Sequence, residues 1–90
     1  MRLENHGQLY AYLRSLSEIL TKHGCSELGY AVAAASDTAW GIPVTEFLGE
    51  SRIALRRVQS EASHILGREQ LKELIDILRQ LDEAMNKHLK

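Results

Sequence analysis

Residues 62–85 read ASHILGREQLKELIDILRQLDEAM, and this stretch decides the fold. After Gly67, apolar residues recur about every 3.5 residues, which is the spacing of one face of an α-helix. The members of this stripe are Leu71, Leu74, Ile75, Leu78, Leu81, Met85 and Leu89. We therefore expect a helix over residues 68–88, with Ile77 off the stripe and close to Ala84.

A second apolar stripe precedes Gly67 and predicts a helix over residues 43–66. Its members are Val44, Phe47, Leu48, Leu55, Val58, Ala62, Ile65 and Leu66. Pro43 suits the first position of this helix. Gly49 lies inside it and costs about 1 kcal/mol relative to alanine, so the pattern leaves its continuity open. Only Gly67 and its neighbours separate the two helices, which predicts an antiparallel hairpin.

The N-terminal half predicts two shorter helices. Leucines at 9, 13, 16 and 20 lie on one face of a helix over residues 5–23, and Gly24 is a typical C-terminal signal. The alanine-rich residues 26–37 predict the second helix. No segment alternates as a strand would. The sequence thus predicts an all-α, four-helix bundle-like domain spanning residues 1–90, in which two shorter N-terminal helices pack on a long C-terminal hairpin.

Composition narrows the possible partners. The chain has 90 residues, 44% hydrophobic and 26% charged, which is enough for one core. The net charge of -1 disfavours nucleic acid and anionic membranes as partners. No apolar run approaches the ~20 residues of a membrane-spanning helix, and no secretory signal is recognisable. With a single cysteine, a cytoplasmic location is expected.

Few residues suggest chemistry. His23 and Cys25 are the closest pair of metal-capable side chains, but a zinc site needs three or four ligands. Cys25 near a helix start meets one condition for an activated thiolate, yet no third group is placed to orient a base. The alternative is a half-buried cysteine at an interhelical turn. We expect no metal, no cofactor and no enzymatic activity.

The segment Glu61-Ala62-Ser63-His64-Ile65-Leu66-Gly67 resembles histidine phosphotransfer domains over a short stretch. Those domains are helical bundles with an exposed histidine two residues before a leucine and near a glycine. Their pattern has a lysine between the leucine and the glycine, which this chain lacks, and their helix continues where Gly67 is expected to end this one. The resemblance implies phosphotransfer at His64; the alternative is a solvated surface histidine.

Several residues suggest a protein interface. Ile53 lies opposite the main stripe on a face with Gly49, and Ile77 lies beside Ala84, which suits a second helix contact. Isolated surface isoleucines are the alternative. Trp40, in the loop over residues 39–43, plugs the end of the bundle or anchors a partner, and the two roles are compatible if one face of the indole stays exposed. A hairpin longer than the helices that cover it also favours a homodimer.

The charged residues of the hairpin predict a salt-bridged surface. Arg52, Arg56 and Arg57 lie among acidic neighbours, and Arg57 is placed to pair with Glu61. Asp82 is expected at the margin of its stripe, reaching solvent or an arginine, because a buried unpaired carboxylate is costly.

These patterns favour a non-enzymatic protein–protein interaction module that acts through a helical surface as a homodimer. The interface candidates are Trp40, Gly49, Ile53, Ile77 and Ala84. One alternative is a small inhibitor or immunity-type protein that occludes a partner, which an acidic patch around Asp37, Glu46 and Glu50 would favour. The other is phosphotransfer at His64.

Overall fold

The computed structural model describes residues 3–40 and 44–89, and within these ranges it is helical with no strand. The helices are α1 (His6–Lys22), α2 (Ser26–Ser36), α3 (Val44–Ala62) and α4 (Arg68–Leu89). Single 3-10 turns follow α2 and α3, namely η1 (Asp37–Ala39) and η2 (Ser63–Ile65). The predicted all-α fold is confirmed. The predicted helix start at Pro43 lies outside the described residues.

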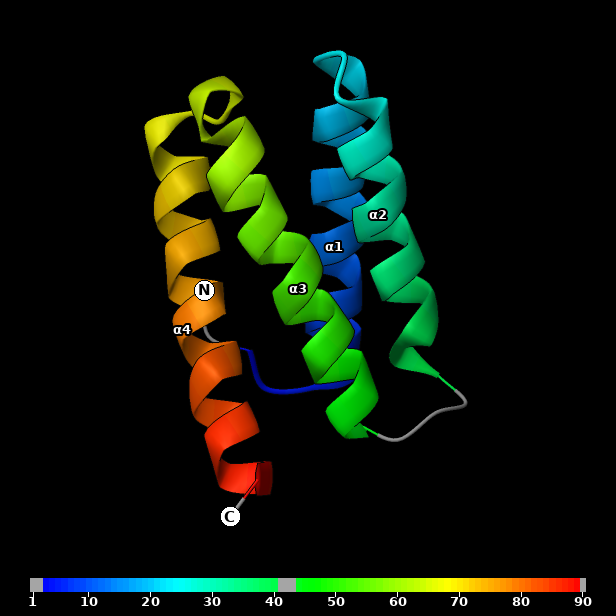
Figure 1. The fold of residues 1–90 in the computed structure, drawn as a ribbon, viewed down its shortest axis with the longest axis vertical. Coiled ribbons are helices and arrows are strands. Elements are labelled where there is room, and N and C mark those ends of the chain that lie inside the picture. The colour runs from blue at the N-terminus through cyan, green and yellow to red at the C-terminus, as the bar shows by residue number, and fades with distance from the viewer. Residues whose placement is uncertain (1–2, 41–43, 90) are drawn as a thin grey trace.

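Successive helices run in opposite directions and form a bundle (Figure 1). α1 packs on α2, α2 on α3 and α3 on α4. Within the described ranges, the backbones of α1 and α4 make no comparably close contact. The N-terminal segment crosses from α4 to the start of α1, and the Leu3 N–H donates to Gln80 Oε1 at 2.7 Å. This N-terminal segment, which we call the strap, therefore bridges the seam between α1 and α4, together with side chains of the core.

Both ends of α1 are fixed by local hydrogen bonds. The Gln8 N–H donates to the Asn5 side chain at 3.0 Å, which caps the first turn. At the other end Gly24 has φ 82°, a conformation that favours glycine. The N–H groups of Gly24 and Cys25 donate to the carbonyls of Thr21 and Leu20, as in a Schellman motif. The chain can thus reverse within a few residues.

α1 and α2 approach each other closely at Gly29. A Cβ at this position would lie 2.5 Å from Thr21 Oγ1 and 3.0 Å from the Ser17 carbonyl oxygen. The Ser17 hydroxyl also donates to the Gly29 carbonyl at 2.8 Å. Only glycine leaves room for this contact, which therefore fixes the packing of α1 against α2.

The hairpin of α3 and α4 is shorter than predicted. α3 ends at Ala62, before η2, so it has 19 residues against 17 in α1. The expected excess of uncovered hairpin is correspondingly reduced. α3 runs through Gly49 without a break, which answers the continuity left open by the sequence. The Gly67 N–H donates to Gln70 Oε1 at 2.9 Å and helps to start α4.

One hydrophobic core joins all four helices. α1 contributes the four predicted leucines, and Phe47, Leu55 and Val58 enter from α3. In α4 the prediction is wrong at two positions: Ile77 is fully buried, whereas Ile75 is 49% exposed. The buried face of α4 consists of Leu74, Ile77, Leu78 and Leu81. Helical periodicity places Ile77 on this face and Ile75 on its solvent side. Ile77 is therefore core, and not part of a second contact face.

Candidate functional site

Trp40 lies on the surface, directly after η1. Its side chain is 61% exposed, so the indole covers the end of the bundle only in part and leaves much of its surface in solvent. The indole packs at a tilt against two rings of α1, with centroid distances of 6.3 Å to His6 and 6.2 Å to Tyr10. His6 in turn meets the buried Phe47 edge to face at 5.4 Å. A chain of aromatic contacts thus runs from the core to an exposed indole.

An open hollow of about 320 Å³ adjoins this aromatic group. It lies between the N-terminal segment, the start of α3 and the last turns of α4. Its apolar walls are Leu3, Leu9, Val44, Leu48, Leu81 and Ala84. We call this cavity the α4 hollow.

The α4 hollow and Trp40 share one wall. Glu4, Asn5 and His6 line the hollow on one side, and the same residues line a shallow depression against Trp40 on the other. We call this region the Trp40 end of the bundle; it comprises residues 3–9, Trp40, residues 44–48 and residues 80–87. In Figure 1 it is the lower end of the molecule, where α1 and α3 begin and α4 ends.

The rim of the α4 hollow carries both signs of charge. Glu4 and Glu83 supply carboxylates and Lys87 an ammonium group, around the aliphatic walls. An apolar floor with a polar rim suits an apolar side chain whose surroundings remain partly solvated. In the described residues no group of three histidine, cysteine or carboxylate side chains is placed to hold a metal ion.

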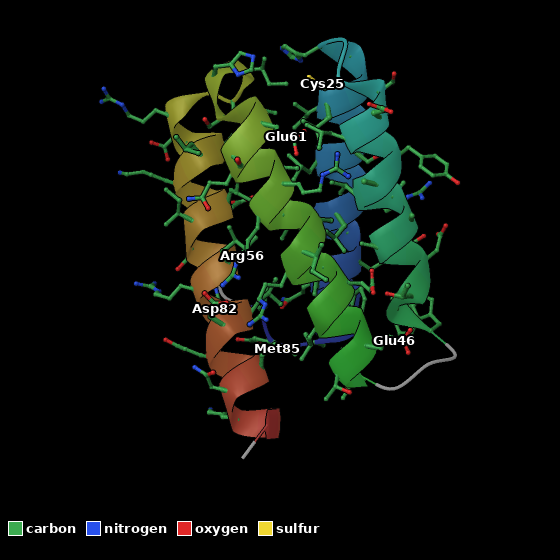
Figure 2. The ribbon with its side chains drawn as sticks, in the orientation of Figure 1. Cys25, Glu46, Arg56, Glu61, Asp82 and Met85 are labelled. Carbon is green, nitrogen blue, oxygen red and sulfur yellow. The ribbon has the colours of Figure 1, made fainter. Side chains whose placement is uncertain are left out.

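The outer face of the hairpin carries the predicted ion pairs. Asp82 Oδ1 accepts from Arg52 Nη1 at 3.3 Å and from Arg56 Nη2 at 3.0 Å. Figure 2 shows Arg56 reaching across from α3 to Asp82 on α4. The predicted reach of Asp82 to an arginine and the pair of Arg57 with Glu61, at 3.1 Å, are confirmed. Asp82 and Glu61 thus each have an arginine beside them, as expected of a solvated, salt-bridged surface.

The structure brings together only some of the interface candidates. Ala84 lies in the wall of the α4 hollow, and Trp40 lies beyond the wall that Glu4, Asn5 and His6 form. Gly49 faces the end of α4, where a Cβ would meet Met85 Cε at 3.8 Å. Ile53 is 58% exposed, but it lines neither the hollow nor the depression at Trp40. Ile77 is buried in the core, as described above.

The two residues weighed for chemistry lie at the opposite end of the bundle: Figure 2 labels Cys25 there, and η2, which contains His64, lies at the same end in Figure 1. Cys25 is the N-cap residue of α2, and its half-buried side chain packs against the core. His64 is exposed in η2, after α3 has ended. A histidine on a continuing helix, as in phosphotransfer domains, is therefore not what this segment forms.

A second, smaller hollow lies further along the seam of α1 and α4. It measures about 70 Å³ and is lined by Tyr12 and Ile19 of α1 and by Gln70 and Glu73 of α4. Burial raises the pKa of the Tyr12 phenol well above its usual range, and the Glu73 carboxylate adds to the effect. The phenol thus stays protonated and neutral beside the carboxylate.

The sequence did not predict the α4 hollow, nor that His6 lines it and contacts Trp40. The only available signal was the apolar Leu3 placed before an Asn5 cap, which indicates that the N-terminal segment returns to the bundle.

Comparison with protein-family models, curated proteins and solved structures gave no match. In the described residues no helix is long and apolar enough to cross a membrane.

Proposed function

We propose that the chain is a non-enzymatic protein–protein interaction module that binds its partner through the Trp40 end. The observation that carries the proposal is the exposed indole of Trp40 beside the α4 hollow. Tryptophan is the residue type most enriched among side chains that dominate binding energy, above all where it meets an apolar pocket. Removing the apolar area of an exposed indole from water is favourable, and a partner that covers the indole would gain this free energy.

The pattern of exposure elsewhere supports this choice of surface. The described residues leave four large apolar side chains exposed, at Tyr30, Trp40, Ile53 and Ile75. Tyr30, Ile53 and Ile75 stand on three different helices, and single exposed apolar residues are ordinary on protein surfaces. Of the four, Trp40 lines the depression that shares Glu4, Asn5 and His6 with the α4 hollow, whereas the other three line neither.

The alternative of an occluding inhibitor has less support. An acidic patch around Asp37, Glu46 and Glu50 would favour it. Arg14 Nη1 lies 3.9 Å from Asp37 Oδ1, so one member of that patch faces a cation. The rim of the α4 hollow also mixes acidic and basic groups. A surface of mixed sign gives no electrostatic preference for a basic partner.

Site-specific photocrosslinking in the cells that make the chain tests the proposal. A benzophenone amino acid replaces Glu83, on the rim of the hollow, and in a matched variant it replaces the exposed Lys72 of the same helix. We expect a defined crosslinked product from position 83, absent from position 72, and lost when Trp40→Ala is added. Equal crosslinking from both positions, or none from position 83, would rule out the Trp40 end as the interaction surface.

A further inference from the structure

We infer that the partner at the Trp40 end is a second copy of this chain, with each Trp40 seated in the α4 hollow of the other. This inference rests on the proposed function and names the occupant of the same surface. It requires that the knob and the hollow fit in size, lie side by side, and meet without electrostatic repulsion.

The sizes agree. A cavity of about 150 Å³ with aliphatic and aromatic walls admits a benzene molecule. The α4 hollow, at about 320 Å³, therefore has room for the two fused rings of an indole but not for a helix. Its walls are aliphatic, and Glu4, Asn5 and Glu83 on its rim offer acceptors for an indole N–H.

The positions agree as well. The α4 hollow and the depression at Trp40 share Glu4, Asn5 and His6, so the knob and the hollow are neighbours on one surface. A two-fold axis that lies in the interface, midway between a knob and an adjacent hollow, carries each knob into the hollow of the other copy. In this arrangement the two His6 side chains lie close to the axis. No second surface is needed, and the assembly closes at two copies.

The charges permit the contact. A chain of net charge -1 repels its own copy weakly. The rim residues Glu83 and Lys87 carry opposite charges on the same turn of α4, so the rim has no single sign to oppose itself. Two indoles that are each 61% exposed, together with the walls that receive them, bury roughly 600 Å² in total, which is below the ~1,200 Å² of a stable interface and is typical of weak, transient association. The dimer is accordingly weak and is to be sought at high protein concentration.

Sedimentation equilibrium up to millimolar concentration tests the inference. The wild-type chain should reach the mass of a dimer. Trp40→Ala removes the knob and Ala84→Phe fills the hollow, and each should weaken association at least about 30-fold, as expected of a central anchor. The matched controls are Tyr30→Ala, at a side chain that is 78% exposed, and Ala34→Phe on the exposed side of α2; both should dimerise like wild type.

Mixing the two variants gives the sharper test. A heterodimer of Trp40→Ala with Ala84→Phe retains one intact pair, because the first chain keeps its hollow and the second its indole. An equimolar mixture should therefore associate more strongly than either variant alone. Ala84→Leu replaces Ala84→Phe if the larger side chain lowers the folded fraction seen by circular dichroism.

The outcomes separate the inference from the proposed function. A wild-type chain that stays monomeric, variants that dimerise normally, or a mixture that fails to associate would each overturn the second-copy inference. If position 83 still crosslinks to a different protein in a Trp40-dependent way, the interaction surface stands and only its occupant was wrong. If position 83 crosslinks to nothing, both proposals fail.

Discussion

The contact of α1 with α2 and the seam of α1 with α4 are built in opposite ways. On the first side, Gly29 lets the backbones approach until there is no room for a Cβ, and the Ser17 hydroxyl ties one helix to the other. On the second side, the helices stay farther apart, and hollows of about 320 and 70 Å³ lie along the seam. The hydrogen bond from the Leu3 N–H to Gln80 crosses this seam. The close side fixes the fold, and the open side carries the α4 hollow, which belongs to the surface that we propose for a partner.

The largest predicted effect tests whether α4 is packed on the core despite the hollows along its seam with α1. Ile77→Ala should lower the free energy of unfolding by about 3 kcal/mol, because it leaves a cavity where Ile77 is fully buried. Ile75→Ala, in the same helix but half exposed, should cost less than about 1 kcal/mol. Urea denaturation of both variants checks the order. Equal costs would mean that α4 is not seated on the core as described.

The next effect breaks the close side. Gly29→Ala places a Cβ against Thr21 Oγ1 and the Ser17 carbonyl, so we expect a net loss of about 2 kcal/mol despite the better helix propensity of alanine.

Gly49→Ala is its matched control. There the added Cβ meets only Met85 Cε, at an ordinary 3.8 Å, and stability should rise by up to about 1 kcal/mol. Ala84→Leu, on the open side, should also be tolerated because it fills the α4 hollow. Thermal and urea unfolding of the three variants measure the contrast. A Gly29→Ala variant as stable as wild type would contradict the close contact.

A smaller effect is expected at the strap across the seam. Gln80→Ala removes the acceptor of the Leu3 N–H and should cost about 1 kcal/mol. The readout specific to the strap is hydrogen exchange, which should become faster at Leu3 while the amides around Gly29 keep their protection. Gln59→Ala, on the exposed side of α3, is the control. Unchanged exchange at Leu3 would show that the strap does not hold the N-terminal segment.

The smallest effect is confined to alkaline pH. Tyr12 has a raised pKa in the folded chain, whereas in the unfolded chain its phenol ionises near pH 10. Above pH 10 the unfolded state therefore gains stability first, and the free energy of unfolding falls as pH rises. Tyr12→Phe should remove about 1 kcal/mol of this loss at pH 11. Urea titrations at pH 8 and pH 11 check it, with Tyr30→Phe as control; parallel losses in both variants would contradict the account.

The features that the sequence predicted correctly are those set by local spacing. The four leucines of α1, the turn at Gly24 and the hairpin at Gly67 follow from helical periodicity and from where glycine is needed. The same is true of the reach of Asp82 to an arginine, because a carboxylate at the edge of an apolar stripe needs a partner.

The features that it missed depend on how the helices are placed in space. Ile75 and Ile77 lie on either side of the stripe of α4, and the direction from which the other helices cover it decides which one is buried. The α4 hollow arises from the distance between α1 and α4, which no residue spacing encodes. The exposure of Trp40 depends on the direction in which the chain leaves η1, and irregular turns carry no periodic signal.

Chemical-shift changes on dilution test the central claim most directly. Amide and indole NMR spectra of the wild-type chain, recorded from millimolar to micromolar concentration, report which residues leave an interface. The account predicts that shifts change at the Trp40 indole, at residues 3–9, at 44–48 and at 80–87, while those around Gly29 and Ile53 stay constant. Changes centred on Ile53, or spectra that do not depend on concentration, would contradict it.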